Sequence, residues 1–185
     1  FSETSRYKPN SPYSASKASS DHFVRAWNKT YGLKTIITNC SNNYGIWQFP
    51  EKLIPVVIAK CLKKESIPIY GNGTNIRDWI YVEDHVKAID LIFHKSKIGE
   101  TYNIGGSNEL KNIDIINTII RISDRLLNRK IGESKRLITY VKDRPGHDFR
   151  YSINSTKIKK LGWKNSDDFE KNLKTTITWY IQKLK

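Results

Sequence analysis

Apolar residues along the chain switch between helical spacing and short β-branched runs. Residues 11–31 predict a helix, because Ser11 supplies a capping hydroxyl, Pro12 stands at the first helical position and Gly32 follows the end. The run TIIT at 35–38 predicts a buried strand. A helix followed by a buried strand indicates an α/β layer.

The same alternation continues to the end of the chain. Helices are expected at 53–62, 82–93, 112–127 (with Asn112 as its cap) and 169–184, and strands at 101–104 and 137–141. Residues 67–70, the turn 71–73 and residues 75–82 predict a β-hairpin-like unit, and loop 143–148 is too polar for a core. The predicted fold class is α/β, a partial Rossmann layer plus a small α/β domain.

Composition narrows the class of protein without naming a function. Hydrophobic residues make up 38% and charged residues 27%, as in an ordinary soluble domain. No stretch approaches 18 apolar residues, and the first residues resemble no signal peptide, so we expect a cytoplasmic protein without a membrane partner. Cys40, Cys61 and the four histidines lack zinc-ligand spacing, which predicts no disulfide and no metal.

The formal charge of +14 would suit a polyanionic partner. The lysines are scattered, however, and no RNA-recognition or zinc-finger signature occurs. Nucleic acid is therefore an unlikely partner, although a basic nucleic-acid-binding module stays open as an alternative.

Tyr13 and Lys17 stand four residues apart and so share one face of the first predicted helix. An ammonium group beside a phenol favours the phenolate, which makes the tyrosine a usable acid and base. With 10 tyrosines in the chain, about one such pair is expected by chance. The spacing alone does not decide whether this is a catalytic pair or a chance match.

A series of longer motifs distinguishes between these two interpretations of Tyr13 and Lys17. They are SPYSASKASSDH (11–22), SNNYGIWQFPEKLIP (41–55), IPIYGNGTNIRDWIYVEDH (67–85), GETYNIGGSNELKN (99–112), DRPGHDFRYSIN (143–154) and LGWK (161–164). In this order they resemble the dTDP-glucose 4,6-dehydratase branch of the extended short-chain dehydrogenases, an NAD-dependent epimerase and dehydratase family, over nearly the whole chain.

The resemblance implies conversion of a nucleoside-diphosphate glucose, dTDP-glucose or UDP-glucose, to the 4-keto-6-deoxy sugar nucleotide, as in rhamnose biosynthesis, by a homodimer that uses NAD. It implies that Tyr13 takes the proton of the sugar 4-hydroxyl while Lys17 holds the nicotinamide ribose and tunes the tyrosine. Asn43 would lie beside the nicotinamide. Without the family, Asn42-Asn43 before Tyr44-Gly45 would be interpreted as a turn.

The family also implies a substrate site spread over several segments. A diphosphate in a partly desolvated cleft requires arginine forks and further donors, and a base requires flat contact area. The residues matched to these roles are Asn42, Lys52, Leu53, Pro68, Ile69, Tyr70, Arg77, Asn112, Asp143, Arg144 and His147.

The chain departs from the family in three respects. Asn39 and Ile46 stand where the family usually has Arg and Pro, and no glycine-rich dinucleotide fingerprint occurs. The family's acidic residues for water elimination would precede Tyr13 by more residues than are present. We therefore expect a C-terminal portion, with 1–45 ending the NAD-binding domain and 46–185 mainly binding substrate, apart from a strand and helix near 82–106 that return to the Rossmann layer.

Two other functions remain open at this level. One is a non-catalytic fragment that binds a sugar nucleotide or a nucleic acid. The other is a related sugar-nucleotide epimerase or decarboxylase, disfavoured because SNNYG (41–45) and RDWIYVEDH (77–85) resemble the dehydratases more closely.

Overall fold

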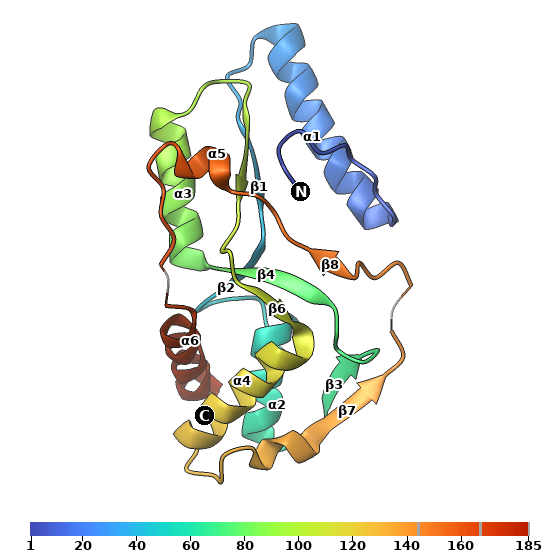
Figure 1. The fold of residues 1–185 in the computed structure, drawn as a ribbon, viewed down its shortest axis with the longest axis vertical. Coiled ribbons are helices and arrows are strands. Elements are labelled where there is room, and N and C mark those ends of the chain that lie inside the picture. Colours follow the sequence, from blue (N-terminus) through green and yellow to red (C-terminus); the bar gives the residue numbers. More distant parts are fainter. Residues whose placement is uncertain (144, 167, 185) are drawn as a thin grey trace.

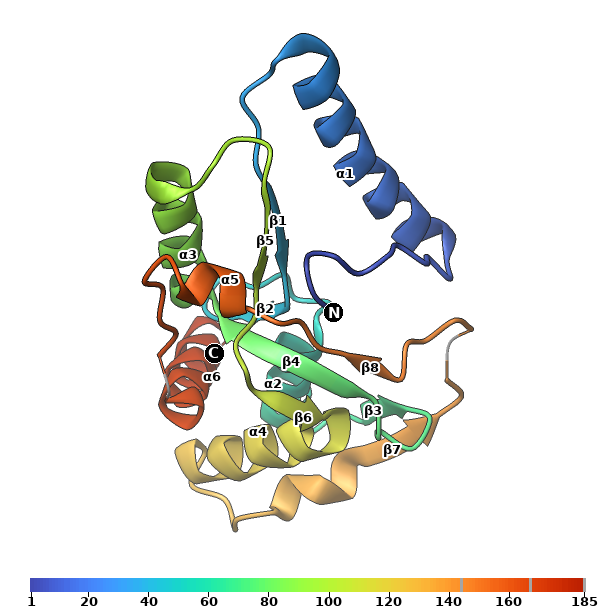
Figure 2. The ribbon, with the colours of Figure 1, turned by 45° about the horizontal axis from the view of Figure 1, so that its top comes forward.

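A computed structural model describes residues 1–143, 145–166 and 168–184. The chain forms two regions that share strand β4 (Figure 1). In one region, α1 and α3 flank the parallel pair β1–β5, and in the other α2, α4 and α6 pack together (Figures 1 and 2). The predicted α/β class is confirmed.

The elements follow one another as a mixture of helices and short strands. Their bounds are α1 Pro12–Tyr31, β1 Ile37–Cys40, β2 Asn42–Tyr44, α2 Leu53–Lys63, β3 Ile67–Tyr70, β4 Ile76–Tyr81, α3 Val82–Lys95, β5 Thr101–Ile104, β6 Glu109–Lys111, α4 Asn112–Leu126, η1 Glu133–Leu137, β7 Ile138–Val141, β8 Arg150–Tyr151, α5 Thr156–Lys159 and α6 Phe169–Leu184.

Three small sheets connect these elements. β1 pairs with β5 in parallel, and β3 pairs with β7 in parallel. β4 pairs in parallel with β2 and β8 and antiparallel with β6. Because β2 begins two residues after β1 ends, β4 is attached directly to the carboxyl end of the β1–β5 pair.

Each region has its own hydrophobic core. The larger core lies between α2, α4 and α6 and includes the fully buried Ile54, Ile58, Ile119 and Leu173. The smaller core joins α3 and α5 to the β1–β5 pair, with Ile80 of β4 in it. β4 therefore contributes to both cores, which fixes the two regions relative to each other.

α1 begins and ends as its sequence predicts. The Ser11 hydroxyl accepts a hydrogen bond from the Ser14 backbone N–H at 3.1 Å. At the other end Gly32 adopts a left-handed conformation, with φ of 68°, and its N–H donates to the Asn28 carbonyl oxygen. This helix carries Tyr13 and Lys17.

The predicted β-hairpin at 67–82 is wrong. β3 and β4 are strands, but β3 pairs with β7 and β4 pairs with β2, β6 and β8. The GNG turn between them does reverse the chain, since Gly71 and Gly73 both have positive φ. It does so between strands of two different sheets, because each strand finds its hydrogen bonds with a segment distant in sequence.

Other differences concern element ends. The strand expected at 35–38 lies at Ile37–Cys40. Asn112 is the first residue of α4 and not its cap, which is Lys111 without a side-chain capping bond. Asn42–Tyr44 forms strand β2 and not the turn that its composition alone favours, because its backbone pairs with Trp79, Ile80 and Tyr81 of β4.

Candidate functional site

Two of the residues matched to the cofactor, Lys17 and Asn43, lie near the carboxyl end of β1. The Cys40 side chain accepts a hydrogen bond from Asn43 Nδ2 at 3.3 Å. Burial raises the pKa of the Cys40 thiol, and the nearby charge of Lys17 acts in the opposite direction. Lys17 of α1 and Asn43 of β2 thus both approach Cys40. Carboxyl ends of parallel strands are where α/β folds bind ligands.

Tyr13 stands one helical turn before Lys17 on α1. Tyr13 is 74% exposed, so its phenol is accessible to solvent and to a ligand. The Ser16 hydroxyl, three residues later, donates to the Tyr13 carbonyl oxygen at 2.8 Å. Tyr13 and Lys17 are both exposed on α1.

Asn43 is held by two residues that the sequence did not single out. His85 Nδ1 lies 2.9 Å from Asn43 Oδ1, and Gln48 Nε2 donates to the Asn43 carbonyl oxygen at 2.7 Å. His85 lies within the quoted motif 67–85 and Gln48 within 41–55. The His85 bond joins residues 42 apart and depends on how β2 meets β4 and α3, whereas the Gln48 bond is local, between residues five apart in an irregular loop.

A second group of predicted residues lies around β3 and the loop that follows β7. Pro68, Ile69 and Tyr70 form β3, with Ile69 buried and Tyr70 exposed. His147 Nδ1 donates a hydrogen bond to Asp143 Oδ1 at 2.7 Å. A β-carbon placed on Gly71 would lie 3.3 Å from the Asp143 carboxylate, so Asp143 sits beside the turn that follows Tyr70.

Arg77 is 9% exposed and its guanidinium lies against the loop before β8. Its NH2 group donates to the Asp148 carbonyl oxygen at 2.7 Å, and its NH1 group donates to the carbonyl oxygens of Ile76 and Phe149 at 2.7 and 3.4 Å. Arg77 therefore fixes the end of the loop that contains Asp143 and His147.

The remaining described residues that the resemblance matches to the substrate lie on β2, at the start of α2 and on α4. Asn42 lies on β2 opposite Trp79 of β4, and Asn112 donates from its backbone N–H to the Asn75 carbonyl oxygen at 3.0 Å. Lys52 is the exposed N-cap residue of α2, followed by the half-buried Leu53. Arg144 lies outside the described residues.

The loop after β7 brings the two groups of residues toward each other. A β-carbon placed on Gly146 would lie 3.5 Å from the carbonyl oxygen of Asn10, directly before the α1 cap. The sequence-predicted residues therefore flank a continuous route from β3 through loop 145–149 to the start of α1.

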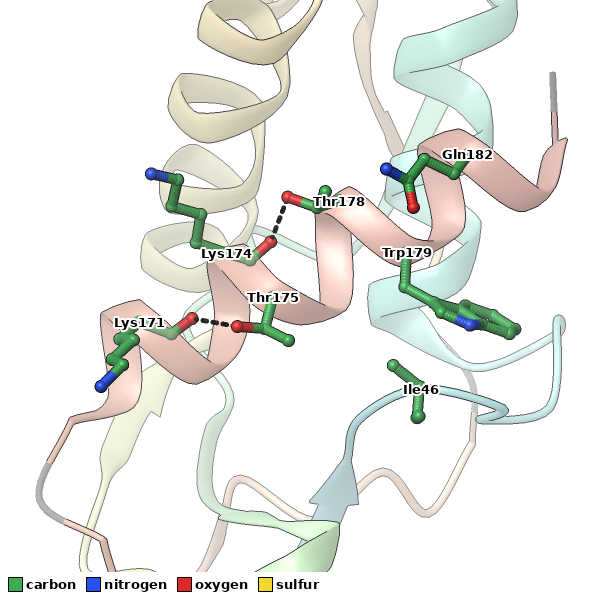
Figure 3. A pocket seen from close by; sticks show the side chains of 7 residues that line it. All are labelled: Ile46, Lys171, Lys174, Thr175, Thr178, Trp179 and Gln182. Atoms are coloured by element: carbon green, nitrogen blue, oxygen red, sulfur yellow. Dashed lines mark hydrogen bonds between the residues drawn. The ribbon is translucent and has the colours of Figure 1, made fainter.

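A separate hollow of about 510 Å³ lies elsewhere, along the outer side of α6 (Figure 3). Figure 3 shows Lys171, Lys174 and Trp179 of this helix around it, with Ile46 opposite Trp179. None of the predicted site residues lines this hollow. Its wall is mainly one exposed helix face, so it does not mark the candidate site.

In the described residues, the grouping of metal-ligating side chains and the length and polarity of the helices bear on metal binding and membrane crossing. In residues 1–143, 145–166 and 168–184, no three His, Cys, Asp or Glu side chains are grouped so that they could hold a metal ion. Among the same residues, every helix is too short or too polar to cross a bilayer.

Comparison with known proteins places the chain in a family. The family model described as GDP-mannose 4,6 dehydratase matches residues 1–176. The chain belongs to this family. The sequence resemblance to dTDP-glucose 4,6-dehydratases is confirmed as well, since the dTDP-glucose 4,6-dehydratase 1 of Escherichia coli strain K12 is 55% identical over all of this chain. The chain spans 51% of the length of that relative.

Solved structures of related enzymes have the same fold. The dTDP-glucose 4,6-dehydratase of Bacillus anthracis, solved in complex with NAD, is 45% identical with a TM-score of 0.87, over 100% of this chain and 58% of the other. The UDP-glucose 4-epimerase of Thermotoga maritima, solved with UDP-glucose, has the same TM-score of 0.87 at 26% identity, over 100% of this chain and 58% of that protein. Fold alone therefore does not separate dehydratase from epimerase.

Proposed function

We propose that this chain is part of an NAD-dependent dTDP-glucose 4,6-dehydratase, a hydro-lyase that forms a 4-keto-6-deoxy sugar nucleotide. The observation that carries the proposal is the 55% identity to the E. coli dehydratase over the whole chain. The 45% identity to the B. anthracis dehydratase, against 26% to an epimerase of equal TM-score, favours dehydration over epimerisation.

The residues at the end of β1 fit such a cofactor. When bound, NAD would accept the hydride from the sugar and later return it. Lys17 offers an ammonium group for a ribose hydroxyl, and Asn43 offers an amide that is already oriented. We propose that the exposed phenol of Tyr13 takes the proton of the sugar 4-hydroxyl, and that Lys17 stabilises the phenolate so produced.

We propose that the second group of residues binds the nucleoside diphosphate. Pro68 and Tyr70 would offer flat area to the base, and Ile69, which is buried in the core, would approach it only through its backbone. Arg77 would offer a planar fork to the diphosphate. Asn42, Lys52, Leu53, Asn112, Asp143, Arg144 and His147 would complete the site. The Arg77 guanidinium is held in one orientation by its bonds to the Ile76 and Asp148 carbonyl oxygens, so it would lose little side-chain entropy on binding an anion.

In this proposal the two regions of the fold bind different molecules, the cofactor and the substrate. We propose that residues 1–45, together with the strand and helix near 82–106, belong to an NAD-binding Rossmann layer and that the rest of 46–185 mainly binds substrate. In support, β1 pairs only with β5 among the described strands, so its other edge is open to a further strand. Such a strand would belong to the part of the relatives' length that this chain does not cover.

Further features support a dimer in a reducing compartment. Phe23, Trp27 and Tyr31 recur every fourth residue on α1 and are exposed, which suits burial against a second copy of the helix. The free thiols of Cys40 and Cys61 are typical of the cytoplasm. We propose a cytoplasmic homodimer.

The test uses a hybrid enzyme, in which this chain replaces the segment of the E. coli dehydratase that it matches. We expect the hybrid to convert dTDP-glucose to a 4-keto-6-deoxy product, measured by its absorbance in alkali, with the E. coli enzyme as the positive control. A folded hybrid that binds dTDP but forms no keto sugar would support a non-catalytic binding role instead. Steeply salt-dependent binding of RNA or DNA would support the nucleic-acid alternative.

A further inference from the structure

The amide of Asn43 has one orientation that its neighbours dictate. Its Nδ2 atom lies 3.3 Å from the Ser41 carbonyl oxygen and 3.3 Å from Cys40 Sγ. A carbonyl oxygen only accepts hydrogen bonds, so the atom facing Ser41 must be the NH2 group. The carbonyl oxygen of the amide, Oδ1, therefore points the other way, toward α3.

The atom that meets Oδ1 is Nδ1 of His85, at 2.9 Å. Because Oδ1 only accepts, His85 Nδ1 must carry the hydrogen. Burial lowers the pKa of His85, which favours the neutral ring. A neutral ring with hydrogen on Nδ1 has no hydrogen on Nε2. Free histidine in water prefers the other tautomer, with its hydrogen on Nε2. The contact with Asn43 thus selects the tautomer.

We propose that His85 is a positioning residue: its Nδ1–H donates to Asn43 Oδ1 and holds the Asn43 amide with its NH2 group toward Cys40 and Ser41. The bond itself rests on geometry alone. Its importance for turnover rests on the proposed function, in which Asn43 lies beside the cofactor.

The backbone of Asn43 is fixed by other contacts, so the remaining freedom is the side-chain torsion, which His85 restricts together with Ser41 and Cys40. The backbone of Asn43 pairs with Ile80 of β4, and its carbonyl oxygen accepts from Gln48 Nε2 at 2.7 Å. An asparagine amide changes little in shape when it rotates by half a turn, but donor and acceptor exchange places. Without His85, only the two 3.3 Å contacts of Nδ2 with the Ser41 carbonyl oxygen and Cys40 Sγ would oppose this rotation.

His85 is well placed for this task by local structure. α3 follows β4 without an intervening loop, since β4 ends at Tyr81 and α3 begins at Val82. His85 therefore lies on the first turn of a helix whose start is fixed by the same strand that pairs with Asn43. Backbone and side chain of Asn43 are both held by one rigid β4–α3 unit.

The decisive experiment is spectroscopic and uses this chain itself. Long-range ¹H–¹⁵N spectra of the ¹⁵N-labelled chain near neutral pH distinguish a protonated ring nitrogen from a bare one, and the chain has 4 histidines to assign. We expect His85 to carry hydrogen on Nδ1. A neutral His85 with hydrogen on Nε2 would overturn the proposal, whatever the activity of the enzyme.

Variants test whether the bond orients Asn43. His85→Asn keeps a donor close to the Nδ1 position, whereas His85→Leu removes it. We expect the Asn43 side-chain NH2 signals to keep slow hydrogen exchange in His85→Asn and to lose it in His85→Leu. His94→Leu, an exposed change on the same helix, is the matched control and should leave these signals unaltered. Unchanged exchange in folded His85→Leu would contradict the proposal.

The hybrid enzyme tests the consequence for turnover. We expect His85→Leu to lower kcat about two- to tenfold, the range of one net hydrogen bond, and His85→Asn to restore most of it. In an Asn43→Ala background, the same His85→Leu change should have no further effect on kcat, because nothing is left to orient. Additive losses would show that His85 acts by another route. An inactive wild-type hybrid would count against the proposed function only. The role of His85 would still be decided by the tautomer measured in this chain.

Discussion

The guanidinium group of Arg77 on β4 donates to the backbone carbonyl oxygen of Asp148 at 2.7 Å. A side chain from a central strand is thereby joined to the loop that precedes β8. The relationship gives Arg77 two tasks in the proposed enzyme, which are to hold this loop and to bind the diphosphate.

We expect Arg77→Lys to weaken dTDP binding by about 1–3 kcal/mol, because a point charge replaces a planar fork. A lysine also cannot reach both the Asp148 and Phe149 carbonyl oxygens as the guanidinium does. Calorimetric titration of the hybrid enzyme with dTDP measures the change, with the exposed Arg136→Lys as control. Equal affinity in Arg77→Lys would remove Arg77 from the nucleotide site.

Tyr13→Phe in the hybrid enzyme should abolish formation of the keto sugar and leave dTDP-glucose affinity within a few-fold. The change removes a proton acceptor and not a binding group, and the 74% exposed ring makes no contribution to the core. Tyr31→Phe, at a similarly exposed position on α1, is the matched control. Normal turnover in Tyr13→Phe would exclude Tyr13 as the acid and base.

Much of the fold follows from sequence patterns that are local. α1 is capped by Ser11 and ended by Gly32, and α6 covers the predicted 169–184, because each signal lies within or beside its own helix. The wrong β-hairpin prediction shows what local patterns do not determine, which is the pairing of strands. GNG at 71–73 is a good turn, but the partners of β3 and β4 are determined by packing between distant segments.

The candidate site divides in the same way. Tyr13 and Lys17 could be named from helical spacing and family resemblance, since both lie on one helix. The bonds that orient Asn43 could not, because His85 and Asn43 are 42 residues apart and meet only once β2 has paired with β4. Arg77 was matched to a ligand, while its bonds to the Asp148 and Phe149 carbonyl oxygens required the structure.

A buried carboxylate makes a prediction about stability away from the site. Asp124 of α4 is fully buried and accepts hydrogen bonds from the Ser134 hydroxyl at 2.5 Å and the Ser134 N–H at 3.2 Å. Ser134→Ala removes the first bond and leaves one carboxylate oxygen without its donor. We expect the free energy of unfolding to fall by about 1–3 kcal/mol in urea denaturation. The exposed Ser19→Ala should change it by less than about 0.5 kcal/mol, and equal values would show that the Asp124–Ser134 bond adds nothing.

His85 should make stability depend on pH. Its pKa in the folded chain lies below the ordinary 6.5, because burial disfavours the charged ring. Below pH 6.5 the unfolded chain takes up a proton that the folded chain resists, so this contribution to stability is lost as the pH falls. Relative to His85→Asn, the wild type should lose stability between about pH 7.5 and pH 5.5. Denaturation of both proteins across this range measures the difference, and His94→Asn, at an exposed position, should follow the wild type.

The final prediction is that this chain alone, even with NAD supplied, has no dehydratase activity. Its sequence contains no glycine-rich phosphate loop, and the family resemblance implies that the acidic residues for water elimination would precede Tyr13 by more residues than are present. Among the described strands β1 pairs only with β5, so the sheet that would carry the cofactor has an open edge. Because groups that act as a unit lose nearly all rate when one is removed, Tyr13 and Lys17 should not retain a proportionate share.

The assay is formation of 4-keto-6-deoxy sugar nucleotide from dTDP-glucose or UDP-glucose by the pure chain with NAD. Adding the part of the E. coli dehydratase that this chain does not match should restore turnover, because it would pair with the open edge of β1 and complete the site. The same mixture made with Tyr13→Phe should remain inactive, which assigns any recovered turnover to this chain. Clear turnover by the pure chain without that addition would show that all the catalytic groups reside in these 185 residues.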